Sequence, residues 1–211
     1  MHSLDLNPTS VLCIGAHCDD VEIGAGGTVL QWISQRPGLR VHWVVLAAQG
    51  ERATEAEKSA GGFLSGATAS VELCHFREGF FPYLPELKEY FDDLAARVEP
   101  EVILTHTRGD LHQDHRTVAE LTLNAFRDHL ILEYEVPKYD GDLGRPNAFV
   151  ELPAEVADRK VRAIIEGFPS QSSRPWFREQ TFRAMMTLRG IECRAADGLA
   201  EAFFAHKLVM R

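Results

Sequence analysis

The sequence predicts an α/β fold in which a mainly parallel sheet is flanked by helices. Short apolar runs rich in β-branched residues alternate along the chain with longer segments of helical periodicity. This alternation is typical of parallel strands connected by covering helices. No internal repeat, low-complexity tract or flexible linker interrupts the series. We therefore expect a single domain over residues 1–211.

The expected elements follow one another in β/α order. The first apolar run should form a buried strand, and a loop containing glycines should lead from it into a helix over 28–35 that ends before Pro37 and Gly38. Pro85 and Pro100 bracket the clearest helix, 84–98, because proline is favoured in the first turn and cannot continue a helix. The expected strands span residues 11–16, 41–48, 71–76, 102–106, 131–136 and 203–209, and the other expected helices span 55–64, 115–126, 153–166 and 177–188.

Charge and composition exclude several classes of partner. The formal net charge is −9, which disfavours binding to phosphate backbones and to anionic lipid surfaces. Apolar runs are too short for a membrane span, and the first residues lack the pattern of a signal peptide. Four cysteines without a C-x-x-C pair indicate a reduced compartment. We expect a cytoplasmic protein with no nucleic-acid partner and no stable membrane insertion, and homo-oligomers remain open.

Polar side chains gather after the first and fourth expected strands. His17, Asp19 and Asp20 follow the first, and His112 and His115 follow the fourth. Ligands in open α/β sheets bind beyond the carboxyl ends of the strands, so both clusters should lie at one edge. Two imidazoles and one carboxylate with an open position are a common catalytic zinc arrangement.

The residue types suggest a division of roles. His17, Asp20 and His115 could hold the metal, while Asp19 could accept a proton from water without occupying the metal. Each residue alone has an ordinary structural interpretation, since paired aspartates often cap helices and histidines often bond to loops. The coincidence of two such clusters at one edge favours the metal site.

The glycines from Gly24 to Gly27 invite a dinucleotide interpretation, which we reject. The G-x-G-x-x-G spacing is absent, and Asp19, Asp20 and Glu22 would place negative charge beside the phosphates. We expect the glycines to allow close packing of the loop and helix against the metal site.

The two clusters resemble a known family. His17-Cys18-Asp19-Asp20, with the later D-x-H-x-D-H formed by Asp110, His112, Asp114 and His115, is similar to the paired motifs of the LmbE and PIG-L family of zinc-dependent de-N-acetylases. The resemblance is strongest from residue 11 to about 126 and implies a Rossmann-like α/β fold.

By position, the resemblance implies a role for each motif residue. His17, Asp20 and His115 would bind Zn²⁺, Asp19 would be the general base, and a protonated His112 would stabilise the oxyanion. Asp114 would orient or tune a histidine in the catalytic set, and Arg52 stands where many relatives carry a substrate-contacting arginine. His106 and Asp110 are further candidates for holding a ligand histidine by a hydrogen bond.

Two residues depart from the family pattern. Cys18 and Gln113 replace the usual prolines, so the two loops lose a residue that fixes φ. Cys18 could itself be a soft ligand, although its neighbours make this sterically awkward, or it could make the site sensitive to oxidants.

The resemblance implies removal of an acetyl group from an N-acetylated amino sugar, with a soluble conjugate favoured over a membrane glycolipid. Loops at 134–153 and 170–176 have residues suited to a sugar rim. One alternative is a zinc-dependent hydratase of an unsaturated dicarboxylate, which needs cationic clamps. Another is a non-catalytic metal- or sugar-binding protein. For the hydratase alternative, the arginines available to clamp the two carboxylates are Arg52, Arg108, Arg145, Arg174 and Arg178.

The identity of the metal is also open to alternatives. Iron, cobalt or manganese could replace zinc in such a ligand set.

Overall fold

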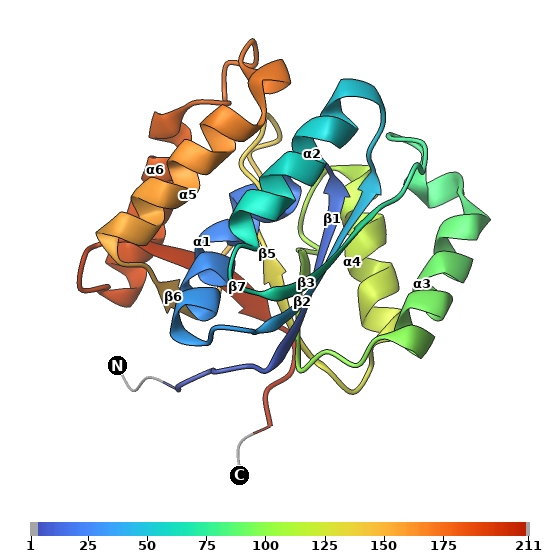
Figure 1. Ribbon diagram of the computed structural model, residues 1–211, viewed down its shortest axis with the longest axis horizontal. Helices are drawn as coiled ribbons and strands as arrows, with labels where there is room; N and C mark the ends of the chain where they lie inside the picture. Colours follow the sequence, from blue (N-terminus) through green and yellow to red (C-terminus); the bar gives the residue numbers. More distant parts are fainter. Residues whose placement is uncertain (1–3, 210–211) are drawn as a thin grey trace.

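The computed structural model describes residues 4–209 and contains one seven-stranded sheet with six α-helices packed on its two faces (Figure 1). The strands are β1 (Ser10–His17), β2 (Arg40–Ala47), β3 (Thr68–Leu73), β4 (Val102–His106), β5 (Leu130–Tyr134), β6 (Ala148–Glu151) and β7 (Ala200–Ala205). The helices are α1 (Asp20–Gln35), α2 (Gly50–Phe63), α3 (Pro85–Arg97), α4 (Gln113–Ala125), α5 (Ala154–Gly167) and α6 (Glu179–Cys193).

The sheet has the order β3-β2-β1-β4-β5-β7-β6, and its first five strands are parallel. β7 runs antiparallel to both β5 and β6. The chain moves outward in one direction from β1 to β3 and in the other from β4 to β5. The carboxyl ends of β1 and β4 therefore flank the topological switch point, where open α/β sheets bind ligands. The α/β class and the mainly parallel sheet are confirmed.

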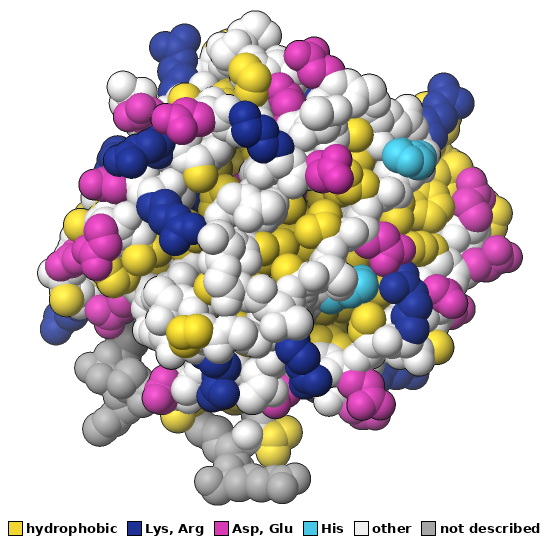
Figure 2. Space-filling view, in the orientation of Figure 1, with side chains coloured by type: hydrophobic (Ala, Val, Ile, Leu, Met, Phe, Trp, Pro, Cys, Tyr) yellow, Lys and Arg dark blue, Asp and Glu magenta, His cyan; other side chains and the backbone are white. Residues whose placement is uncertain are grey.

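Two apolar layers cover the sheet. On one face, α1, α2, α5 and α6 share a core with β1 and β2 that includes Trp43 and Phe63. On the other face, Phe91 of α3 and Val118 of α4 share a core with Leu12 and Ile103 of the sheet. The surface in Figure 2 intersperses basic and acidic side chains between apolar ones. This face therefore offers no continuous basic surface to a phosphate backbone.

The helix after β1 begins earlier than the glycine pattern predicts. α1 starts at Asp20, so Gly24, Gly26 and Gly27 lie inside a helix and not in a loop. A Cβ on Gly24 would stand 2.2 Å from the ring of Tyr134, and one on Gly26 would stand 2.6 Å from Phe63. The glycines therefore allow close packing, as expected, but against the sheet and α2 and not against the proposed ligands.

Other differences from the predicted elements are smaller. β3 starts at Thr68 and β7 at Ala200, each three residues before its predicted start, and α2 begins five residues early at Gly50. β6 was not predicted. It is a four-residue strand in which three residues are only partly buried, so its alternating pattern is too short to separate from a loop.

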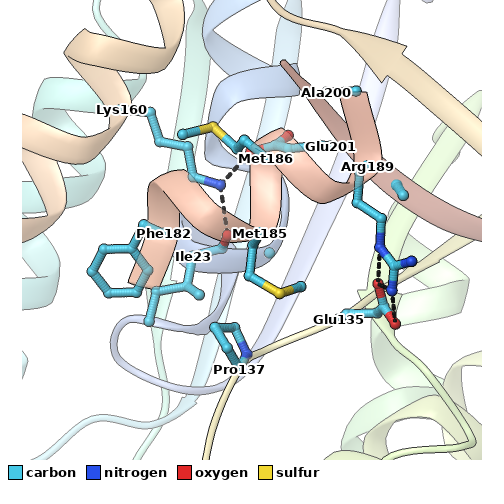
Figure 3. Close-up of a pocket in the computed structure, with 12 residues that line it drawn as sticks. Ile23, Glu135, Pro137, Lys160, Phe182, Met185, Met186, Arg189, Ala200 and Glu201 are labelled. Carbon is cyan, nitrogen blue, oxygen red and sulfur yellow. Dashed lines mark hydrogen bonds and ion pairs between the residues drawn. The ribbon is translucent and has the colours of Figure 1, made fainter. Parts of the chain in front are cut away.

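Two buried ion pairs attach the C-terminal helices to the sheet, and Figure 3 shows them around a small cavity. Lys160 Nζ donates to Glu201 Oε1 and to the carbonyl oxygen of Ile23, both at 2.6 Å. Arg189 donates through Nη2 and Nε to the carboxylate of Glu135 at 2.7–3.0 Å. The Glu135 pair thus connects α6 to the loop that follows β5.

Within residues 4–209, none of the helices combines the length and apolar character needed to cross a bilayer.

We expect Gly24→Ala to lower the free energy of unfolding by about 1–3 kcal/mol, because the new methyl group overpacks a rigid, buried ring. Gly61, inside α2, is the matched control, since a Cβ there meets no atom within 4 Å. Gly61→Ala should raise stability by about 0.5–1 kcal/mol. Urea unfolding of both variants measures the difference, and equal effects would contradict the packing argument.

Arg189→Met should cost about 3–5 kcal/mol of stability, because it leaves the Glu135 carboxylate buried without its partner. Arg183, on the same helix, pairs with Asp158 at 2.8 Å in an exposed position. Arg183→Met should therefore cost at most about 1 kcal/mol. Thermal unfolding of the two variants tests this, and a smaller loss for Arg189→Met than for Arg183→Met would disprove the assignment.

Candidate metal centre

The predicted ligands come together at the carboxyl edge of the sheet. His17 is the last residue of β1, Asp20 is the first residue of α1, and His115 lies in the first turn of α4. All three side chains are buried. Asp20 also accepts the backbone N–H of His17 at 2.7 Å. This bond closes the turn between strand and helix and brings two of the three side chains into one corner.

Three potential ligand atoms converge in this corner. His17 Nδ1 is 3.1 Å from His115 Nε2 and 3.2 Å from Asp20 Oδ2. His115 Nε2 is 3.4 Å from Asp20 Oδ2. Ligands about 2.0–2.1 Å from a tetrahedral zinc stand roughly 3.3 Å from one another. The triangle therefore has the size that a single divalent ion requires.

A carboxylate orients each of the two histidines from behind. His17 Nε2 is 3.3 Å from Asp114 Oδ2, and His115 Nδ1 is 2.9 Å from Asp110 Oδ2. With the protons on these outer nitrogens, the inner nitrogens carry lone pairs that face Asp20. Such carboxylate–histidine pairs fix the tautomer and raise the basicity of a metal ligand.

Both orienting carboxylates are themselves held. Asp114 accepts the backbone N–H groups of Gly79 at 2.6 Å and of Phe81 at 3.2 Å. Asp110 pairs with Lys138 Nζ at 2.9 Å and accepts the N–H of His112 at 2.7 Å. The ligand histidines are thus fixed by a second layer drawn from three separate loops.

The electrostatics of the site fit its use by a cation. Burial lowers the pKa of His17, but Asp20 and Asp114 outweigh burial and raise it to about 10. Burial raises the pKa of Asp20, but the neighbouring His115, His106 and His17 hold it well below its usual range. Protons and a metal ion compete for the same atoms in such a site.

Asp19 lies beside the ligands without joining them. Its Oδ1 accepts a hydrogen bond from Arg52 Nη2 at 2.9 Å, and its Oδ2 is buried with no partner among residues 4–209. Burial and the charge of Asp20 raise its pKa, while Arg52 opposes the shift. A raised pKa suits a carboxylate that must accept a proton near neutral pH.

His112 is the N-cap of α4 and is only partly buried. Its Nδ1 accepts the N–H of Asp114 at 3.3 Å, which leaves the proton on Nε2. Burial and the charges of His115 and His17 lower its pKa. An Nδ1 that accepts this hydrogen bond carries no proton, so this geometry corresponds to a neutral His112, whereas a protonated ring is the form expected from the sequence.

His106 offers an alternative ligand, since Asp20, His106 and His115 also group closely enough to hold an ion, as do His17, His112 and His115. However, His106 Nε2 accepts the N–H of Ala16 at 3.0 Å, which engages its lone pair. His106 lies 3.2 Å from Asp20 Oδ2 and stacks on His115. It is therefore better placed to support the ligands than to bind the ion.

The two residues that replace the usual prolines both have structural roles. Cys18 Sγ is buried and directed at the carbonyl oxygen of Ala47, and burial raises its pKa to about 12. Both features disfavour a soft-ligand role and oxidant sensitivity for Cys18, because the thiolate is the reactive form and burial disfavours it. Gln113 Nε2 donates to the carbonyl oxygen of Gly79 at 2.5 Å and so holds the loop that supports Asp114.

Sequence reasoning missed Lys138 and the backbone N–H groups of Gly79 and Phe81. Lys138 stands in the loop after β5 and joins Asp110 and Asp142, at 2.9 and 2.6 Å. A lone lysine in a polar loop carries no distinguishing pattern, and backbone N–H groups carry none at all. Asp142, expected at the sugar rim, instead accepts from Lys138 and from the N–H of Leu111.

Comparison with known families finds one model that matches. It is PIG-L, described as GlcNAc-PI de-N-acetylase, and the match spans residues 12–126. That span contains all seven residues predicted for the site and ends at the residue after α4.

Solved structures with similar folds cover nearly the whole chain. N,N'-diacetylchitobiose deacetylase from Pyrococcus horikoshii is 19% identical, with a TM-score of 0.75 over 94% of this chain and 84% of that chain. A conserved protein from Thermus thermophilus is 20% identical, with a TM-score of 0.77 over 95% and 96%. The 4-carboxy-2-hydroxymuconate hydratase of Pseudomonas putida is 19% identical, with a TM-score of 0.76 over 96% and 98%. The fold thus serves more than one chemistry.

If the triangle binds an ion, protein purified without chelator or affinity metal should contain about one divalent metal per chain, and His115→Ala should lose it. Asp110→Asn should weaken the affinity by about 10–100-fold, because it removes the carboxylate that orients His115. His75, which bonds to the carbonyl oxygen of Ala48, supplies the control His75→Ala. Mass spectrometry measures metal content, and full occupancy in His115→Ala would exclude this site.

Proposed function

Because this chain belongs to the PIG-L family and its His17–Asp20–His115 triangle has the dimensions of a metal site, we propose that it is a metal-dependent amidohydrolase. Its reaction is removal of the N-acetyl group from an amino sugar. The observation that carries the proposal is the buried, unpartnered Oδ2 of Asp19 beside the triangle. A site that only bound metal would have no use for such a carboxylate.

His17, Asp20 and His115 are the residues that hold the ion. Two nitrogens and one oxygen suit zinc first, while iron, cobalt and manganese accept the same donors. A bound divalent ion polarises the amide carbonyl and lowers the pKa of water toward about 7. Asp110 and Asp114 keep the two histidines in the tautomer that binds.

Asp19 acts as the general base. Its free Oδ2 accepts the proton of the attacking water, while Arg52 keeps Oδ1 occupied. The proton then passes to the nitrogen of the leaving amine. Asp19 is able to return it there, and the products are acetate and the free amino sugar.

His112 stabilises the negative charge that develops on the carbonyl oxygen. Its Nε2–H is the available donor, because Nδ1 already accepts from the backbone of Asp114. A donor that meets charge only in the transition state lowers the barrier more than it tightens ground-state binding. A neutral imidazole performs this role without a protonated ring.

The substrate of this proposal is a soluble N-acetylated amino-sugar conjugate. Tyr83 and Tyr139 are exposed, and side chains of this kind suit contact with a sugar face. Tyr139 adjoins Lys138, which pairs with Asp110. The loop that carries Tyr139 therefore also contributes a residue to the ion pair behind His115.

The hydratase alternative is less well supported. It needs arginines free to clamp two carboxylates, yet Arg52 is paired with Asp19 and Arg108 with Glu133 at 3.0 Å. Two of the five candidate clamps are therefore engaged already. Loss of ultraviolet absorption from a conjugated diacid, without release of an amine, would favour hydration over deacetylation.

Asp19→Asn should reduce kcat by about 10²–10⁴-fold, because the amide cannot accept the proton of water. It should keep its metal, since Asp19 is not in the triangle. Amine release from a panel of N-acetylglucosamine conjugates, with metal content measured in parallel, tests this. Equal kcat in Asp19→Asn and in the wild type would show that Asp19 is not the general base. Absence of wild-type turnover on every conjugate would overturn the proposed function.

A further inference from the structure

Arg52 does not occupy a free, substrate-facing position in the structure. Its Nη2 donates to Asp19 Oδ1 at 2.9 Å, and only about a quarter of its side chain is exposed. Asp19 is almost fully buried, so the ion pair joins a partly exposed guanidinium to a buried carboxylate. The partner of Arg52 is therefore a residue of the chain itself.

The two carboxylate oxygens of Asp19 have different environments. Oδ1 accepts the charge-assisted hydrogen bond from Arg52, whereas Oδ2 is buried without a partner among residues 4–209. A buried carboxylate oxygen without a partner costs desolvation free energy and therefore calls for an explanation.

The backbone of Arg52 is fixed in a helix, and its guanidinium has a second acidic neighbour. Its backbone belongs to the first turn of α2, and its Nη1 lies 3.7 Å from Glu78 Oε2. Glu78 directly precedes Gly79, whose N–H binds Asp114. One loop thus supports the proposed base through Arg52 and the ligand His17 through Asp114.

We infer that Arg52 is a positioning residue that fixes Oδ1 of Asp19 and so presents Oδ2 as the atom that accepts the proton. This inference rests on the proposed function, because it assigns a helper to the proposed base. It replaces the expectation that Arg52 contacts substrate.

The two roles predict different kinetics. A residue that binds substrate in ground and transition states alike mainly changes KM, whereas one that aligns the base changes kcat. Misplacing a reactive group by about 1 Å can cost roughly 10²-fold in rate. We therefore expect Arg52→Ala to lose about 10²-fold in kcat, with KM within about twofold of wild type.

Chemical rescue sharpens the test. Guanidinium added to Arg52→Ala should restore kcat in a saturable way, because it can refill the space beside Asp19 Oδ1. Arg52→Lys should retain more kcat than Arg52→Ala, since an ammonium still donates to Oδ1 without the planar geometry. Arg36→Ala is the control, because Arg36 lies at the far end of α1 and binds Asn7. It should show wild-type kcat and no response to guanidinium.

The experiment measures kcat, KM and metal content for the wild type and these variants on one N-acetylglucosamine conjugate that the wild type hydrolyses. Rescue of kcat at constant KM and full metal content supports the inference. A raised KM with unchanged kcat, loss of metal, or no change at all would overturn it while the deacetylase proposal stands. Absence of wild-type turnover on every conjugate would overturn both.

Discussion

The convergence of His17 Nδ1, Asp20 Oδ2 and His115 Nε2 within 3.4 Å is the constraint on which the rest of the site depends. Three lone-pair donors at this separation repel one another unless a cation or a proton lies between them. The parallel sheet makes the arrangement possible, because it ends β1 and β4 side by side at the switch point. Everything around the triangle either orients these atoms or shields them.

The surrounding support comes from distant parts of the chain. Asp114 is fixed by backbone N–H groups from the segment after β3, and Asp110 by Lys138 after β5. Glycines in α1 let that helix lie against Tyr134, whose hydroxyl donates to the carbonyl oxygen of Ile14 at 2.7 Å. The position of Asp20 is therefore set by packing along α1 as well as by its own hydrogen bonds.

Much of this could be predicted from the sequence, for reasons that particular residues make clear. β4 was predicted to the residue because the short apolar run Val102–Leu104 passes into the polar segment that carries the motif. The start of α1 was missed because its glycines resemble a loop until Tyr134 and Phe63 are in place. The partner of Arg52 was missed for the same reason, since a contact between residues 33 positions apart leaves no local pattern. Long-range packing, and not local propensity, decided each of these cases.

Lys138 connects the loop after β5 to the residues behind the proposed ligands. Its ammonium group joins Asp142, in the loop after β5, to Asp110, which orients His115. An evolutionary change or a designed library that rewrites this loop to accept another substrate also alters the charge behind a metal ligand. If this loop contacts the substrate of the proposed reaction, specificity and metal retention would be coupled, and a loop exchange would need to keep Lys138 or a substitute cation.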